Sequence, residues 1–180
     1  KGTFVTDRNP IAPFRADMKQ RIKRAKHLAR KSSTDDLRIN TERASQEVAK
    51  DLSLGDDTEV ITSSYVRVLN KQRIGYAESA IPASLGIKLT AKDFRLNTML
   101  TILEDKGIVL SGIDHLIGAT LADARLAGLL GIQVGAPLVR IKMVMLDLQH
   151  KPIQRAIAFF RADQYEHHMF MTSEAKKKPE

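Results

Sequence analysis

The chain has 180 residues, of which 43% are hydrophobic and none is cysteine. This is enough apolar material for one domain with a core, and it excludes disulfides and thiolate metal sites. The formal net charge of +8 favours anionic partners. No apolar run approaches the roughly 18 residues of a membrane span and no signal peptide is evident, so we expect a soluble, cytoplasmic protein with no membrane partner.

The N-terminal part divides into three segments. Residues 1–6 read KGTFVT without a partner strand, as if cut from something larger, and residues 7–13 contain two prolines and no hydrophobic period, which is typical of a linker. A helix is predicted over residues 14–30, with an apolar stripe formed by Phe14, Met18, Ile22, Ala25 and Ala29. Residues 19–31 are dense in Lys and Arg, which indicates a solvated helix face by default, or else a DNA-facing patch or a funnel for an anionic ligand.

The remaining elements follow from hydrophobic periods and turn residues. A strand is predicted over residues 37–41, and a helix over residues 41–52 with Thr41 as its N-cap. The later predictions, in chain order, are a hairpin of residues 60–69 and 74–81, a helix over 91–107, a strand over 108–121, a helix over 120–130, and a hairpin of residues 138–148 and 152–165.

A shift of 78 positions places residues 41–82 on residues 119–160 without a gap. Apolar helix positions then coincide, such as Val48 with Leu126 and Leu52 with Leu130, and so do the two hairpin turns. Each unit reads strand, helix, loop, hairpin, and we expect the two units to pair in one antiparallel sheet. Two such halves commonly leave a crevice where they meet, and we expect a ligand there.

The last predicted strand, residues 152–165, ends in an unusual polar pattern. The five consecutive apolar residues 156–160 favour a central strand that is buried on both faces. Arg161, Asp163 and Tyr165 follow at alternate positions and can project together. The simpler interpretation is a structural ion pair between Arg161 and Asp163; the alternative is that this strand floors a ligand pocket.

Catalytic and metal-binding motifs are absent from the sequence. The 5 histidines do not cluster, and there is no phosphate-binding glycine loop, nucleophile elbow or cysteine, so we expect no metal and no cofactor. Arg67 and Glu78, on the two strands of the first hairpin, predict either a cross-strand salt bridge or a site in which Arg67 grips a carboxylate or phosphate. Gln154 and Arg155 are the matching positions in the second hairpin, and His115 is either structural or a donor to an anion.

Three stretches of the sequence together resemble a known family. These are the opening KGTFVT with the helix start PFRADMKQRI, the segment LADARLAGLLGIQVGAPLVRIKMVMLDLQHKPIQ, and the ending FFRADQY. They are similar to the UTRA domain, the effector-binding half of HutC-subfamily regulators in the GntR family. The resemblance implies a chorismate-lyase-like α+β fold around a mostly antiparallel sheet. It also implies that residues 1–13 are the remnant of a winged-helix wing plus linker, that residues 14–170 form the domain, and that residues 171–180 are a disordered tail.

The resemblance further implies a function and a set of site residues. The chain would be the effector-binding and dimerisation domain of a homodimeric transcription regulator, expected to be a repressor, whose absent winged-helix domain binds operator DNA. A small anionic or polar effector would bind between the halves. The expected effector-binding residues are Phe14, Arg15, Arg67, Glu78, His115, Gln154 and Tyr165. The first hairpin has Ile74 where the second has Pro152, and Tyr65 stands where sugar-phosphate-binding relatives often have a further Arg.

Two other functions remain open at the level of the sequence. A chorismate-lyase-type enzyme would share the implied fold and would need an acid or electrophile in the crevice, for which Glu78 with Arg67 is the one pair available. A nucleic-acid-binding module is supported by the basic helix alone, because the sequence has no base-reading motif and no aromatic residues between the basic ones.

Overall fold

Six strands form one sheet in the computed structural model, which describes residues 18–95 and 97–167. The strands are β1 (Ser33–Arg43), β2 (Glu59–Leu69), β3 (Gln72–Pro82), β4 (Leu110–Leu121), β5 (Pro137–Asp147) and β6 (Pro152–Arg161). Their order across the sheet is β1-β2-β3-β6-β5-β4, and every neighbouring pair is antiparallel. The expected antiparallel α+β architecture is therefore confirmed. The expectations for residues 1–13, for Phe14 and Arg15 and for the tail over residues 171–180 lie outside the described residues.

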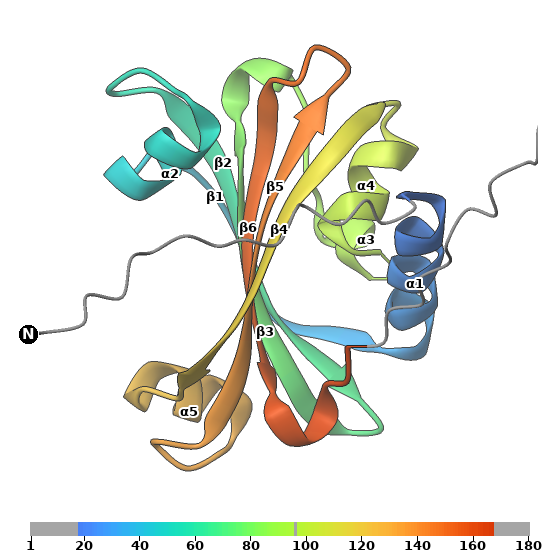
Figure 1. Ribbon diagram of the computed structural model, residues 1–180, viewed down its shortest axis with the longest axis vertical. Coiled ribbons are helices and arrows are strands. Elements are labelled where there is room, and N and C mark those ends of the chain that lie inside the picture. Colours follow the sequence, from blue (N-terminus) through green and yellow to red (C-terminus); the bar gives the residue numbers. More distant parts are fainter. Residues whose placement is uncertain (1–17, 96, 168–180) are drawn as a thin grey trace, which may run out of the picture.

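The helices cover the two faces of this sheet unequally. To the right of the sheet in Figure 1 lie α1 (Met18–Lys31), α3 (Ala91–Phe94) and α4 (Met99–Asp105), and to its left lie α2 (Gln46–Leu52) and α5 (Ala124–Leu130). Two short 3₁₀ helices, Ala83–Leu85 and Ala162–Gln164, follow β3 and β6. We call the two sides the α4 face and the α2 face. None of the described helices is long and apolar enough to cross a membrane.

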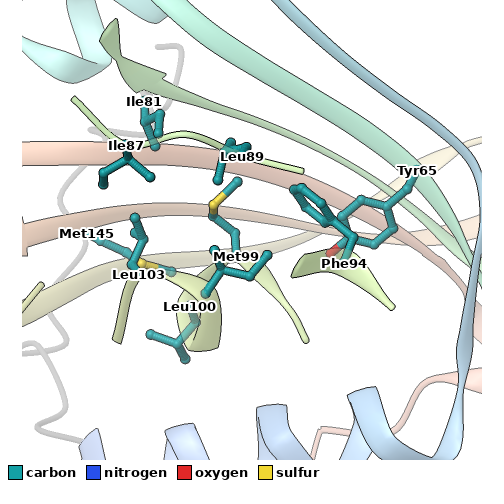
Figure 2. Close-up of a cluster of buried hydrophobic side chains, with 10 residues drawn as sticks. Tyr65, Ile81, Ile87, Leu89, Phe94, Met99, Leu100, Leu103 and Met145 are labelled. Atoms are coloured by element: carbon teal, nitrogen blue, oxygen red, sulfur yellow. The ribbon is translucent and has the colours of Figure 1, made fainter. Parts of the chain in front are cut away.

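Each face of the sheet has its own apolar core, because side chains alternate along a strand. On the α4 face, Tyr65 and Met145 pack with residues of α3 and α4 such as Phe94 and Leu103, as Figure 2 shows. On the α2 face, Val66 and Tyr76 pack with residues of α5, and a smaller cluster around Leu52 joins α2 to β2 and β3. Burying each of these large side chains stabilises the fold by about 1.5–3 kcal/mol, so both faces contribute to stability.

The strand pair β3 and β6 joins the two units at the centre of the sheet, and the predicted pairing of the two units in one antiparallel sheet is confirmed. β6 is buried over most of its length on both faces, which confirms the prediction of a central strand. The repeat also extends further than the sequence comparison reached. α1, β1, α2, β2 and β3 recur in the same order as α4, β4, α5, β5 and β6. Helices α2 and α5 begin at the equivalent N-caps Ser45 and Asp123, whose side chains accept from backbone N–H groups three residues on.

The gapless alignment of the two hairpins is wrong by one residue in the return strands. The ladder of β2 with β3 has a bulge at Ile74, since Arg67 pairs with Gly75 and Val68 with Arg73. The ladder of β5 with β6 has the same bulge at Ile153, since Met145 pairs with Gln154 and Leu146 with Pro152. Ile74 is therefore equivalent to Ile153, and the second hairpin turn is one residue longer than the first.

Two predicted helices have different bounds in the structure. Residues 41–43 stay in β1, where they pair with β2, and the helix begins after Ser45, so Thr41 is not its N-cap. The single helix predicted over residues 91–107 is divided into α3 and α4. Thr90 begins α3 with a capping box to Asp93. Thr98 begins α4, and its backbone N–H donates to Thr101 Oγ1 at 3.0 Å. Each cap fixes the start of a helix. The apolar residues that were predicted to line one helix therefore belong to two short helices.

Candidate functional site

Arg67 on β2 is a charged side chain buried in the α4 face. Its residue is 3% exposed. The guanidinium donates to Thr34 Oγ1 at 3.3 Å, to the main-chain oxygen of Asn97 at 3.2 Å, and more weakly to Ser32 Oγ at 3.5 Å. Its Cζ atom lies 4.8 Å from the centroid of the Tyr65 ring. All of these partners are neutral, so the positive charge is hydrogen-bonded without being neutralised.

The charge of a second buried arginine, Arg155, is neutralised by carboxylates. Arg155 on β6 is 5% exposed and faces α2. Its Nη2 atom lies 2.6 Å from Glu47 Oε1 and its Nε atom 3.0 Å from Asp51 Oδ2, while Lys142 Nζ lies 2.5 Å from Asp51 Oδ1. By contrast, none of the ion pairs among the described residues includes Arg67. Removing a cation from water is costly unless an anion compensates it, and the hydrogen-bond partners of Arg67 in the described part of the chain supply no such anion.

The Asp51 carboxylate responds to these cations. Burial alone would raise the pKa of Asp51, but the hydrogen bonds from Lys142 and Arg155, together with their charges, hold that pKa below its usual value. Asp51 is therefore ionised and engaged in a structural network. The sequence indicated Arg155 as a possible counterpart of the first-unit site; the structure places it in this network that attaches α2 to the sheet.

Aromatic residues extend the α4 face beyond Arg67. Arg67 pairs across the sheet with Gly75, and Gly75 pairs with Phe160, so these three residues lie on one face. The absence of a side chain at Gly75 admits the Phe160 ring, since a Cβ atom there would lie 2.6 Å from Phe160 Cδ1. Tyr165 stacks on Phe160 with 5.1 Å between ring centroids, and its hydroxyl lies 3.1 Å from His167 Nδ1. Tyr165 thus lies on the Arg67 side of the sheet, as does His115, whose ring centroid is 6.2 Å from that of His167.

Gln154 occupies the same face at the other end of β6. It is fully buried, and its Nε2 atom donates to Ser79 Oγ at 3.1 Å. Its Oε1 atom and the hydroxyl of Ser63, the residue that pairs with Ser79, have no hydrogen-bond partner among the described residues. Ser63 precedes Arg67 by four residues on β2, a distance of roughly 13 Å along a strand. The α4 face therefore has two polar points, a cation at Arg67 and unpaired oxygen atoms near Gln154.

Glu78 lies on the opposite face, and the expected pair of Arg67 with Glu78 does not form. The bulge at Ile74 places Arg67 opposite Gly75, and a shift of one residue reverses the faces of a strand. Glu78 instead lies 3.3 Å from the Tyr76 hydroxyl and 3.9 Å from Arg125. The acid and electrophile that the enzyme alternative requires are therefore separated by the sheet.

Glu78 also lines a polar pocket of about 370 Å³ on the α2 side. Its lining combines residues of β1, β2, β3, β6 and α2: Arg38, Asn40, Glu42, Ser45, Glu47, Val48, Thr62, Ser63, Ser64, Tyr76, Glu78, Ser79, Ala80 and Arg155. Of the seven expected effector-binding residues, Glu78 alone is among those that line this pocket. The cations and carboxylates in it are mixed, and its buried arginine is already paired with Glu47 and Asp51, so it lacks the uncompensated charge found at Arg67.

The ion pair predicted at the polar end of β6 is present. Arg161 and Asp163 form a two-point ion pair with distances of 3.0 and 2.6 Å. A hydrogen bond from Arg161 lowers the pKa of the Asp163 carboxyl.

Within residues 18–95 and 97–167 no group of three or more His, Asp or Glu side chains could hold a metal ion. The sequence analysis did not predict the neutral partners of Arg67, which are Ser32, Thr34 and the backbone of Asn97. These residues are distant from Arg67 in the sequence, and only the fold brings them together.

Structures of transcription regulators share this fold. The chain superimposes on YydK from Bacillus subtilis, a candidate transcriptional regulator, with a TM-score of 0.74 and 19% identity over 81% of this chain. It matches the effector domain of PhnF from Mycobacterium smegmatis with a TM-score of 0.72 and 20% identity, covering 85% of this chain and 94% of that one. It also matches the ligand-binding domain of a candidate GntR-family regulator from Bordetella bronchiseptica. The TM-score is 0.71 and the sequence identity 19%, and the match covers 79% of this chain and 90% of that one. The fold is thus that of the ligand-binding domains of GntR-family regulators.

The family follows from the sequence match. Residues 27–166 match the model of the UTRA domain, and the chain belongs to this family of effector-binding regulatory domains. It spans 65% of the YydK chain, which has additional sequence outside the shared region. The curated proteins include no match to the chain.

Proposed function

We propose that this chain is the effector-sensing domain of a HutC-type GntR-family regulator and that its effector is a small anion held by Arg67. The observation that carries this proposal is the buried guanidinium of Arg67, which has three neutral hydrogen-bond acceptors and no carboxylate partner among the described residues. A carboxylate or phosphate would supply the missing charge through the planar fork of the guanidinium.

The other site residues are assigned by their face of the sheet. Gln154 lies on the Arg67 face, where its free Oε1 atom can accept a hydrogen bond from a hydroxyl or amine of the effector. Tyr165 and His115 lie on the same face, beyond Phe160. Phe14 and Arg15 would close the site from the segment before α1. Glu78 takes no part in this arrangement, because it lies across the sheet.

The regulator as a whole would act on DNA. We infer that a winged-helix domain precedes residue 1, that two chains associate, and that effector binding changes the spacing of the two DNA-binding domains on operator DNA. Repression that is relieved by the effector is the expected mode, and the regulator would work where its operator lies, in the cytoplasm. The inference of a further domain is supported by the solved regulator YydK, of which this chain covers 65%, and the other inferences follow from membership of the UTRA family.

A thermal-shift screen with anionic metabolites tests the proposal. A ligand present at 100 times its dissociation constant adds about 2.7 kcal/mol to the free energy of unfolding. A hit should be lost in Arg67→Met and kept in Arg38→Met, a matched variant whose arginine lines the α2-side pocket. The reverse pattern would move the effector to that pocket. A hit that both variants keep would reject both Arg67 and the α2-side pocket as the effector site.

The enzyme alternative receives no support from the site, and we propose that the domain has no catalytic activity. Arg67 and Glu78 lie on opposite faces of the sheet, and the three solved relatives described above are regulators or regulator domains. Incubation of the purified domain with chorismate should give no turnover. Turnover that Arg67→Met abolishes would restore the enzyme reading.

A further inference from the structure

The α2-side pocket has a floor of small side chains. Thr62 and Ser64 on β2 and Ala80 on β3 line it. Thr62 pairs with Ala80 and lies two residues from Ser64, so the three side chains share one face of the sheet. Figure 1 shows α2 at one end of this face and α5 at the other. The pocket volume of about 370 Å³ lies in the range of small-molecule sites, roughly 300–1,000 Å³.

An arginine and a glutamate stand on opposite sides of this floor. Arg38 on β1 pairs with Ser64, and Ser64 pairs with Glu78 on β3, so the three form one row across the strands. Neighbouring strands are about 4.8 Å apart, which places the backbones of Arg38 and Glu78 roughly 10 Å apart with a serine between them. None of the ion pairs in the described part of the chain includes Arg38. Both residues line the pocket, and they do so without neutralising each other.

Both charged groups keep hydrogen-bonding capacity for a ligand. The Glu78 side chain is 35% exposed, and Arg125 lies at the long ion-pair distance of 3.9 Å from its Oε2 atom. The same oxygen accepts a hydrogen bond from the Tyr76 hydroxyl at 3.3 Å. A carboxylate has about four acceptor sites, so Glu78 can accept further bonds from an ammonium group. Arg38 is exposed, and its guanidinium offers the planar fork of donors that matches a carboxylate.

The second unit shows that the fold does not require these charges. Its equivalent row consists of Leu116, Lys142 and Ile157, which pair across β4, β5 and β6. The middle position carries a long side chain in place of the serine, and Lys142 extends from there to Asp51. The outer positions are apolar, where the first unit has an arginine and a glutamate. The open floor and the two opposite charges beside it therefore belong to the first unit alone.

We propose that the α2-side pocket binds a small zwitterion, an amino acid in which several carbon atoms separate the ammonium group from the carboxylate. The carboxylate binds Arg38, the ammonium group binds Glu78, and the Ser64 hydroxyl lies between them. A ligand with negative charge alone would meet Glu78 and Glu42 as like charges, and one with positive charge alone would meet Arg38. Because Arg67 lies on the opposite face of the sheet, this is a second binding site, beyond the proposed effector site.

Calorimetry on the 180-residue chain with 5-aminopentanoate, 6-aminohexanoate and 7-aminoheptanoate tests the proposal. At least one of the three should bind with a measurable dissociation constant. Its two analogues with a single charge, the carboxylate without the amine and the amine without the carboxylate, should bind about tenfold more weakly or worse, because each loses one charged contact. Binding by none of the three zwitterions, or equal binding by a single-charge analogue, would overturn the proposal.

Variants of the charged row locate the zwitterion that binds. Arg38→Met and Glu78→Gln should each weaken its binding by about tenfold or more, and Ser64→Lys, which copies the second unit, should abolish it. The matched control Glu59→Gln removes a carboxylate of β2 that does not line the pocket and should leave the affinity unchanged. Full affinity in Arg38→Met or in Glu78→Gln, with the variant folded by its urea transition, would refute this site. The test of Arg67 uses anionic metabolites, so either proposal can fail while the other stands.

Discussion

The guanidinium of Arg67 donates a hydrogen bond to the main-chain oxygen of Asn97, 3.2 Å away, and so connects β2 to the segment between α3 and α4. Asn97 directly precedes Thr98, the N-cap of α4. The anion proposed to bind Arg67 would compete for this donor and would so couple ligand binding to the position of α4. In the proposed function, the sensing step would therefore lie at this junction of strand and helix.

Replacement of the two buried arginines should change stability by different amounts. Arg67→Met removes an uncompensated buried charge and three hydrogen bonds to neutral groups, and we expect the free energy of unfolding to change by no more than about 1 kcal/mol. Arg155→Met leaves Asp51 and Glu47 without their main partner and should cost about 3 kcal/mol. Urea denaturation measures both values. Equal losses in the two variants would mean that Arg67 is as structural as Arg155.

The Asp51 network should make stability depend on pH in the acid range. The pKa of Asp51 is lowered in the folded protein, so its ionised form stabilises the fold above the unfolded-chain pKa of about 3.9. This stabilisation is lost as the pH falls through the lower folded-state pKa. We expect Asp51→Asn to be less stable than the wild type at pH 7, with a difference that shrinks below pH 4. A constant difference between pH 7 and pH 3 in urea titrations would exclude this role.

Gly75 should tolerate no side chain, because Phe160 occupies the space above it. A Cβ atom would lie 2.6 Å from Phe160 Cδ1 and 3.0 Å from the main-chain oxygen of Phe159. Gly75→Ala should therefore destabilise the domain by about 1–3 kcal/mol. Gly128→Ala in α5 is the control, since a Cβ atom there meets nothing within 4 Å and alanine favours a helix by about 1 kcal/mol. Thermal unfolding that ranks the two variants the other way would show that Phe160 can move aside.

The 180-residue chain alone should bind DNA weakly despite its net charge of +8. We expect a gel shift with promoter DNA from upstream of its own gene to show only salt-sensitive, sequence-independent binding, because phosphate contacts carry no sequence information. Scrambled DNA of equal length is the control. A tight, sequence-specific shift by this chain would contradict the assignment of DNA binding to a separate domain.

The sequence predicted the sheet well because its signals there are local. The strand predicted over residues 37–41 lies within β1, and the five apolar residues 156–160 lie within β6, which is buried over most of its length, so both predictions are confirmed. The duplication predicted that the two units share one antiparallel sheet, and the structure adds that they join through β3 and β6. Helix starts were predicted less well. Thr41 and Ser45 are both acceptable N-caps, and pairing of Thr41 with Ile61 keeps Thr41 in a strand.

The site was harder to predict because a single bulge decides it. Counting back from the turn at Asn70 and Lys71 without a bulge would place Arg67 opposite Ile74 and on the same face as Glu78. The extra residue at Ile74 reverses that relationship. No residue type in the hairpin marks the bulge, so the sequence could name Arg67 and Glu78 but not the face that each occupies. The neutral surroundings of Arg67 depend on contacts with Thr34 and Asn97, which lie far from it in the chain.

Calorimetry with the effector found by thermal shift tests the central claim most directly. Charged hydrogen bonds contribute about 1.5–3 kcal/mol each, so we predict that Arg67→Met weakens binding by about 100-fold or more while Arg38→Met leaves the dissociation constant within about threefold. Unchanged affinity in Arg67→Met, with the variant folded by its urea transition, would contradict the account and make Arg67 a structural residue.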